Sequence, residues 1–161
     1  MGYEYMGDSE DRRFLGVDHG LPISKLRGVP AAARVKLKRQ RITTCAQLLA
    51  AAAAAPERAA LAVSTGVEPA ILQLLVRRAD LARIRGIGTV FGLMLEEVGV
   101  HDIEQLARQD AAKLHAALRS YNLRERLARR SPTLEEVSEW VAAARMLPIV
   151  ITYGAAAGAA D

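Results

Sequence analysis

The amino-acid sequence predicts an all-α protein with two similar halves, and three observations support this expectation. Hydrophobic residues make up 51% of the chain but aromatic residues only 4%, so alanine and aliphatic side chains supply the apolar mass. Such side chains favour helices that pack closely. The sequence also repeats itself at a fixed offset, and patterns typical of helix starts recur in both halves.

The internal repeat appears when the chain is shifted by 58 residues along itself. Residues 26–29 (LRGV) then align with residues 84–87 (IRGI), and residues 42–48 (ITTCAQL) align without a gap with residues 100–106 (VHDIEQL). Apolar positions between these anchors correspond at helical spacing. The sequence therefore contains two copies of one unit.

Each copy begins with a glycine turn, continues through about three turns of helix, and breaks before a short polar residue. Thr44 precedes Gln47 by three positions, and Asp102 precedes Gln105 in the same way. This spacing lets the side chains satisfy free N–H groups at a helix start. We therefore expect two helix-hairpin-helix repeats packed as one compact helical domain.

Two later segments carry the same helix-start pattern. Thr65 precedes Glu68, and Thr133 precedes Glu136, each ahead of an apolar helical segment. The offset between the copies has grown to about 65 residues here. We therefore predict an extra helical turn or loop in the second copy, near residues 121–123.

The chain is expected to divide into four segments. A short apolar run, residues 149–153 (IVITY), has extended propensity and follows a proline, so we predict a short extended C-terminal arm packed on the helices. An arm that reaches a second subunit is the alternative. The predicted segments are a flexible tail (1–20), the first repeat (21–83), the second repeat (84–148), and the arm with a low-complexity tail (149–161).

Composition restricts the classes of function. Lys and Arg number 22 against 18 Asp and Glu, a formal charge of +4, which permits nucleic-acid binding without requiring it. The single cysteine, Cys45, excludes an internal disulfide and aligns with Ile103, which predicts a buried position. We find no pattern of a signal peptide or a membrane span and expect a cytoplasmic protein.

The glycine turn of the second copy is the most informative segment. Gly86 and Gly88 flank an apolar residue and permit positive φ, so backbone N–H groups at the following helix start can approach an anion closely. Thr89 adds a hydroxyl group. Four arginines precede the turn, with the second and fourth expected on nearly one helical face: Arg77, Arg78, Arg83 and Arg85.

The first copy distributes these features differently. Pro30 stands where the second copy has Gly88 and removes an N–H donor, which predicts a weaker anion site. Residues 19–56, however, contain no acidic residue and the densest basic run of the chain. We expect one basic stripe on this copy, made by Arg34, Lys38 and Arg41.

These segments resemble a bacterial domain-of-unknown-function family, number 4332, over roughly residues 22–153. The resemblance is carried by residues 26–29, 79–88, 114–118, 132–137, Trp140 and 151–153. It implies a helical fold related to helix-hairpin-helix DNA-binding modules, and it implies no reaction or substrate. Pro30 and Thr89 depart from the family pattern.

The sequence shows no pattern that indicates catalysis. The three histidines lie far apart, and no nucleotide-binding loop or nucleophile elbow is present, so we expect no metal, no cofactor and no enzymatic activity. Our first hypothesis is a protein that binds DNA phosphates largely without regard to base sequence. The predicted DNA-binding residues are Arg27, Arg34, Lys36, Lys38, Arg39, Arg41, Arg85, Gly86, Gly88 and Thr89.

A second hypothesis assigns no nucleic acid to these surfaces. In this case the helices form a protein-interaction or scaffold module, and the unequal charges of the two copies serve binding to a protein partner or to a second copy of the chain. Both hypotheses predict the same helices. They differ in where the basic side chains point.

Overall fold

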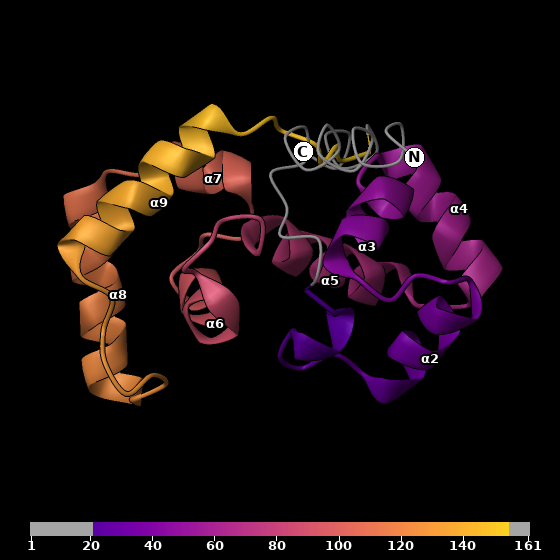
Figure 1. The fold of residues 1–161 in the computed structure, drawn as a ribbon, viewed down its shortest axis with the longest axis horizontal. Coiled ribbons are helices and arrows are strands. Elements are labelled where there is room, and N and C mark those ends of the chain that lie inside the picture. The colour runs from indigo at the N-terminus through magenta and orange to yellow at the C-terminus, as the bar shows by residue number, and fades with distance from the viewer. Residues whose placement is uncertain (1–20, 155–161) are drawn as a thin grey trace, which may run out of the picture. The chain divides into compact units, whose positions relative to one another are not determined.

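The computed structural model describes residues 21–154, and this part of the chain is helical, with no strand assigned within it (Figure 1). The predicted all-helical fold is confirmed. A short 3-10 helix, η1 (Ile23–Lys25), precedes the α-helices. These are α2 (Ala31–Arg39), α3 (Cys45–Ala52), α4 (Ala55–Thr65), α5 (Pro69–Leu81), α6 (Gly88–Glu97), α7 (Ile103–Ala107), α8 (Ala111–Glu125) and α9 (Leu134–Met146).

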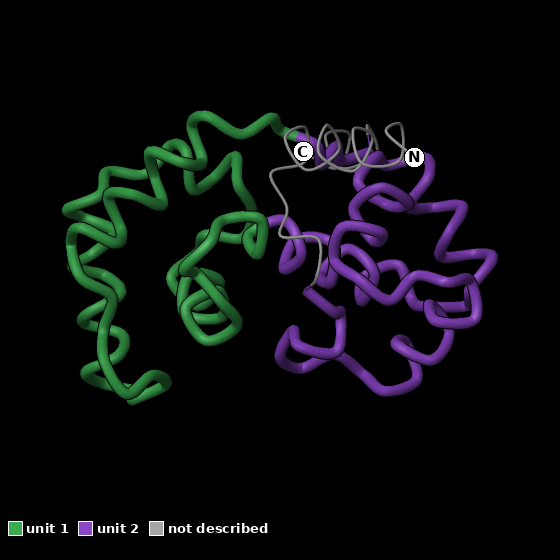
Figure 2. Tube along the Cα trace, viewed as in Figure 1, with its two compact units in different colours: residues 1–17, 81–149 green, residues 18–80, 150–161 purple. Residues whose placement is uncertain are grey.

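The chain divides into two compact units (Figure 2). Unit 2 comprises residues 18–80 and 150–161, so its described part holds η1, the helices α2 to α4 and most of α5. Unit 1 comprises residues 1–17 and 81–149 and holds α6 to α9. The predicted terminal tails, residues 1–20 and 155–161, lie outside the described residues.

The junction between α2 and α3 in unit 2 follows the predicted pattern. The N–H of Ile42 donates to the carbonyl of Leu37, 3.1 Å away, and closes the end of α2. At the start of α3, the Thr44 hydroxyl accepts a hydrogen bond from the N–H of Gln47, and the Gln47 side chain accepts one from the N–H of Thr44. This reciprocal cap confirms the prediction for residues 44–47.

The C-terminal arm packs on the helices of unit 2. Ile151 is buried, and the N–H of Thr152 donates to the carbonyl of Ala53 at 3.0 Å. The Thr152 hydroxyl accepts from the N–H of Ala55 at 2.8 Å, which satisfies a donor at the start of α4. Within the described residues, the predicted arm is not helical and packs on the helices of this unit, as expected.

A buried arginine, Arg58, bonds both this arm and the end of α3. Arg58 donates from Nη1 to the carbonyls of Ala52 and Ala53, at 3.2 and 2.9 Å, and from Nη2 to the carbonyl of Thr152 at 2.8 Å. Its guanidinium group also lies 5.7 Å from the centre of the Tyr153 ring. Burial lowers the pKa of Arg58 from its ordinary value.

Unit 1 has its own apolar core, in which α9 packs against α7 and α8. The helix starts are capped by side chains: Asp102 accepts from the N–H of Gln105, and Thr133 accepts from the N–H of Glu136. Glu136 returns the bond to the N–H of Thr133, as predicted. Gln105 instead accepts from the N–H of His101 at 2.8 Å, one residue earlier than the expected partner.

The predicted cap at Thr65 is wrong. Thr65 is the last residue of α4, and its hydroxyl donates to the carbonyl of Leu61 at 2.6 Å. Gly66 then ends α4 in the left-handed region, with φ +74°, and α5 begins at Pro69. Thr65 therefore finds its acceptor within the helix that precedes it, because glycine terminates that helix directly afterwards.

The extra residues expected near residues 121–123 lie in α8 and the loop after it. Helix α8 has 15 residues against 11 in α4. Asn122 is buried and fixes the following loop, because its Nδ2 donates to the carbonyl of Ala128 at 3.1 Å and its Oδ1 accepts from the N–H of Ala128 at 2.8 Å.

Within residues 21–154, no helix is long and apolar enough to cross a bilayer.

Candidate functional site

We define the second glycine turn as residues 86–89, in unit 1. Gly86 and Gly88 have φ values of +95° and +63°, and Ile87 between them is buried. Helix α6 begins at Gly88, and no side chain caps this start. The first N–H groups of a helix lack acceptors within the helix, so the turn presents backbone donors to whatever lies in front of it.

The two glycines of this turn differ in what surrounds them. A Cβ on Gly86 would lie 3.6 Å from Nε1 of Trp140, so this glycine packs on a buried side chain. A Cβ on Gly88 would meet nothing within 4 Å. Both glycines are exposed, and Gly88 is the one with open space around it, where a ligand can come close to the backbone.

A groove of about 540 Å³ lies between this turn and the loop after α8. The sequence interpretation did not identify the loop side of the groove, although the basic run at residues 124–130 (RERLARR) was a visible signal. Arg129 and Arg130 are exposed there. The lining residues are Gly86, Ile87, Gly88, Thr89, Val90, Phe91, Leu127, Ala128, Arg129 and Arg130.

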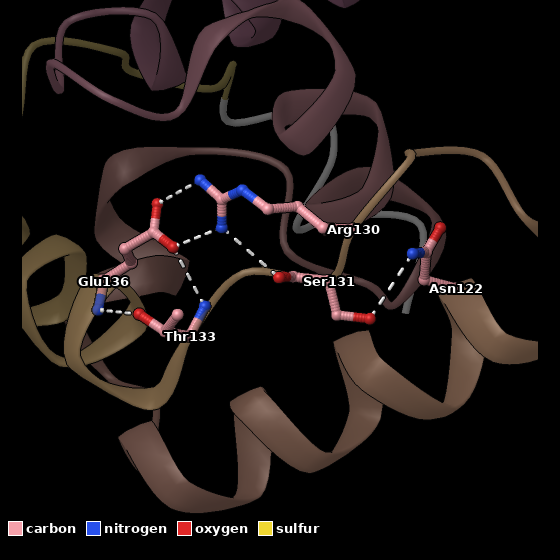
Figure 3. Close-up of polar contacts among 5 residues, drawn as sticks. All are labelled: Asn122, Arg130, Ser131, Thr133 and Glu136. Atoms are coloured by element: carbon pink, nitrogen blue, oxygen red, sulfur yellow. Dashed lines mark hydrogen bonds and ion pairs between the residues drawn. The ribbon is translucent and has the colours of Figure 1, made fainter.

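Arg130 is held in place by a carboxylate of α9 (Figure 3). Its Nη1 lies 2.6 Å from Oε1 of Glu136, and its Nη2 lies 3.1 Å from Oε2. The hydrogen bonds from Arg130 and from the backbone of Thr133 lower the pKa of Glu136 to about 2. The same pair raises the pKa of Arg130, so both groups are charged at neutral pH.

The guanidinium group of Arg130 also lies over an aromatic ring. Its central carbon is 5.4 Å from the centre of the Phe91 ring. Phe91 in turn contacts Trp140, with ring centres 5.5 Å apart. Trp140 is the buried side chain beneath Gly86, so the turn, the two rings and Arg130 form one continuous contact.

The arginines before the turn do not form the predicted basic face. Helix α5 ends at Leu81, so Arg85 does not continue its surface. Arg77 donates to the Tyr153 hydroxyl at 3.0 Å, and Arg83 is buried and donates to the carbonyl of Pro148 at 2.9 Å. Of these side chains, Arg85 is the exposed one.

Arg78 contacts the first glycine turn, residues 27–30 in unit 2, although Arg27, Gly28 and Pro30 are exposed. Nη1 of Arg78 donates to the carbonyl of Arg27 at 2.7 Å, and a Cβ on Gly28 would lie 3.2 Å from the same nitrogen. Pro30 stands at the N-cap position of α2 and has no N–H. This turn therefore offers less open backbone than the second one.

The basic side chains of unit 2 do not all lie on one surface. Arg34 and Lys38 line one groove of about 350 Å³, together with Pro22, Ser24, Val35, Ile42 and Thr43. Lys36 points elsewhere and donates from Nζ to the carbonyl of Gly66 at 3.2 Å. Arg41 follows the end of α2 with φ +62° and does not line the groove, so the predicted three-residue stripe is reduced to Arg34 and Lys38.

The predicted site residues thus fall into two groups. Gly86, Gly88 and Thr89 line the groove of unit 1, and Arg34 and Lys38 line the groove of unit 2. The remaining exposed residues of the predicted site lie outside both grooves: Arg27, Arg39, Arg41 and Arg85. Each groove is a candidate site within its own unit.

Cys45 is buried, as predicted, and burial raises the pKa of its thiol to about 12. A thiol with such a pKa carries almost no thiolate at neutral pH. Within residues 21–154, no group of three or more His, Cys, Asp or Glu side chains is placed to hold a metal ion.

These features define a class of protein, an all-helical chain with an open glycine turn beside a groove that two arginines line. The model of a domain of unknown function, DUF4332, matches residues 27–147. The chain therefore belongs to this family. No curated protein and no solved structure gives a significant match.

Proposed function

We propose that this chain is a non-enzymatic, cytoplasmic protein of two helix-hairpin-helix repeats that binds DNA largely without regard to base sequence. The second glycine turn contacts a backbone phosphate, and the basic groove of unit 2 contacts another part of the DNA. One observation carries the proposal: the uncapped start of α6 at Gly88 borders a groove that Arg129 also lines.

The second glycine turn has the physical properties that a phosphate requires. The helix start carries a partial positive charge and free N–H donors. Gly88 places no side chain in front of them, and the Thr89 hydroxyl lies in the same groove. Arg129 is exposed, lines the same groove and adds a full positive charge. Contacts of this kind position a protein on DNA and do not read bases.

The groove of unit 2 supplies a second contact of the same chemical kind. Arg34 and Lys38 are exposed and lie one helical turn apart on α2. Residues 19–56 contain no acidic residue, so local repulsion of a phosphate is weak. Arg39 and Arg41, exposed nearby in the sequence, add to the positive potential that attracts DNA from a distance.

The proposal is tested by titrating labelled duplex DNA with the full chain at several salt concentrations. We expect binding that weakens steeply with salt. Gly88→Ala places a Cβ where the phosphate approaches and is expected to weaken binding about tenfold, a loss of about 1.4 kcal/mol. Gly99→Ala is the matched control, because Gly99 also has a positive φ and open space around it, and it lies outside the groove.

The contribution of unit 2 is tested by charge reversal. The double variant Arg34→Glu, Lys38→Glu is expected to weaken duplex binding more than Lys113→Glu, Arg119→Glu, which changes the net charge equally at exposed positions of α8. Equal effects of the two double variants would show that DNA binding depends on the net charge of the chain and not on the groove of unit 2. If the wild-type chain binds no duplex at low salt, the proposal is wrong and the scaffold hypothesis takes its place.

A further inference from the structure

We propose that the groove of unit 1 holds one unpaired base, stacked on the guanidinium plane of Arg130, when a neighbouring phosphate lies at the second glycine turn. This inference rests on the proposed DNA binding and refines it. It predicts that the protein favours DNA in which at least one nucleotide is unpaired, such as a single-stranded overhang.

The shape and lining of the groove favour an occupant larger and less polar than a phosphate. Its volume of about 540 Å³ falls within the range typical of small-ligand sites. Ile87, Val90, Phe91 and Leu127 form apolar walls, and Arg129 supplies positive charge. One nucleotide matches both the apolar walls and the positive charge, because it carries a flat, weakly polar base on a charged backbone.

Arg130 has the geometry of a stacking platform. Glu136 occupies the two Nη atoms through a pair of short hydrogen bonds, and Nη1 also donates to the carbonyl of Ser131 at 3.4 Å. These bonds fix the guanidinium plane and neutralise much of its charge (Figure 3). The side chain nevertheless remains 60% exposed. What it offers a ligand is therefore its flat face, on which an unstacked base packs well.

The guanidinium group of Arg130 is also supported from within unit 1. Phe91 lies beneath Arg130, and Trp140 lies against Phe91. The loop that carries Arg130 is tied down by Asn122, which bonds both backbone groups of Ala128. A platform that is already ordered loses little entropy when a base stacks on it.

Arg124 provides a matched comparison within the same unit. Its guanidinium group lies 5.7 Å from the centre of the Tyr121 ring, and its Nε lies 3.4 Å from Oε1 of Glu125. It thus also combines an aromatic neighbour with a carboxylate. It does not line the groove with the second glycine turn. Arg124→Lys therefore controls for the loss of an exposed arginine plane.

The experiment compares three labelled DNA molecules with the full chain at one salt concentration: a blunt duplex, the same duplex with a single-stranded overhang, and that overhang made abasic. The last two carry equal charge and differ only in bases. We expect the base-containing overhang to bind about tenfold more tightly than the abasic one. Arg130→Lys keeps the positive charge and is expected to abolish that difference by weakening overhang binding more than blunt-duplex binding, and Arg124→Lys is expected to preserve the difference.

A second variant covers the case in which Arg130→Lys disturbs folding. Ala128→Phe fills the groove and leaves the Arg130–Glu136 pair in place. It is expected to abolish the same preference, whereas Ala112→Phe at an exposed position of α8 preserves it. Thermal melts establish that each variant is folded.

Distinct outcomes separate the two proposals. If base-containing and abasic overhangs bind equally while duplex binding still depends on Gly88, the stacking inference is overturned and the proposed function stands. If Arg130→Lys weakens blunt-duplex binding as much as overhang binding, Arg130 is not a platform for a base. If none of the three DNA molecules binds, both proposals fall.

Discussion

The two glycine turns have similar sequences and different surroundings. At the first, Arg78 bonds the carbonyl of Arg27 and lies against Gly28, and Pro30 removes a donor. At the second, Gly88 has open space before it, and α6 begins without a side-chain cap. The same local pattern is therefore a turn bonded to Arg78 in unit 2 and a turn with open space at Gly88 in unit 1.

The two units also differ in where their positively charged side chains lie. In unit 2, Arg34 and Lys38 gather in a groove on the side of α2. In unit 1, Arg129 lines the same groove as the glycine turn, from a loop distant in the sequence. A function that uses both units therefore places different chemistry in each.

The largest effect is expected on the stability of the unit that holds the first turn. Arg58→Ala removes three hydrogen bonds from a buried cation to backbone carbonyls of α3 and the arm, which we expect to cost about 3 kcal/mol of unfolding free energy. Arg145→Ala is the comparison in unit 1, because Arg145 also donates to two carbonyls but is exposed. We expect about 1 kcal/mol there. Urea denaturation measures both, and equal losses would contradict the role of burial.

The next prediction separates the two turns directly. Gly28→Ala is expected to cost about 1–2 kcal/mol of stability, because it combines strain at positive φ with a close approach to Arg78, and to leave duplex binding within about twofold. Gly88→Ala is expected to cost less stability and to weaken binding about tenfold. Denaturation and DNA titration of both variants are the measurements. If Gly88→Ala cost more stability than Gly28→Ala, or if Gly28→Ala weakened binding more than Gly88→Ala, the difference described between the turns would be wrong.

A smaller, pH-dependent effect is expected at Glu136. Its pKa is about 2 in the folded chain, below its ordinary value of 4.5. The pair with Arg130 therefore stabilises the fold above about pH 4.5, and this contribution is lost as the pH falls towards 2. Glu136→Gln keeps a capping side chain and is expected to cost about 1 kcal/mol at pH 7. Melting temperatures measured between pH 2 and 7 should fall less with acid in Glu136→Gln than in the wild-type chain. The same pH dependence in both chains would contradict the role given to the Arg130–Glu136 pair.

The smallest effect is expected at Cys45. Because burial raises the pKa of its thiol to about 12, a thiol reagent at pH 8 should label the folded chain extremely slowly and the unfolded chain rapidly. Labelling with and without denaturant, followed by mass spectrometry, measures this ratio. Fast labelling of the folded chain would show that α3 opens readily.

The sequence predicts much of the fold because its signals are local. The caps at Thr44 and Thr133 require only residues three positions apart, and both are present. The same rule fails at Thr65, because Gly66 ends α4 there and the hydroxyl turns back to Leu61. A local pattern cannot tell whether a threonine starts the next helix or ends the previous one.

The candidate site is less predictable because its contacts are distant in the sequence. Charge and spacing suggest that Arg77, Arg78 and Arg83 face solvent, yet each donates to an acceptor far along the chain. Arg129 lines the groove of the second glycine turn from the loop after α8, which Asn122 bonds at Ala128. The basic run at residues 124–130 is visible in the sequence, but nothing local in the sequence places it beside the second glycine turn.

The most direct test of the difference between the turns is a titration of the ¹⁵N-labelled chain with duplex DNA, followed by amide NMR signals. The account predicts that the amides of Gly88 and Thr89 shift most among residues of the two turns and that the amide of Gly28 shifts little. Large shifts at Gly28 with none at Gly88 would contradict it.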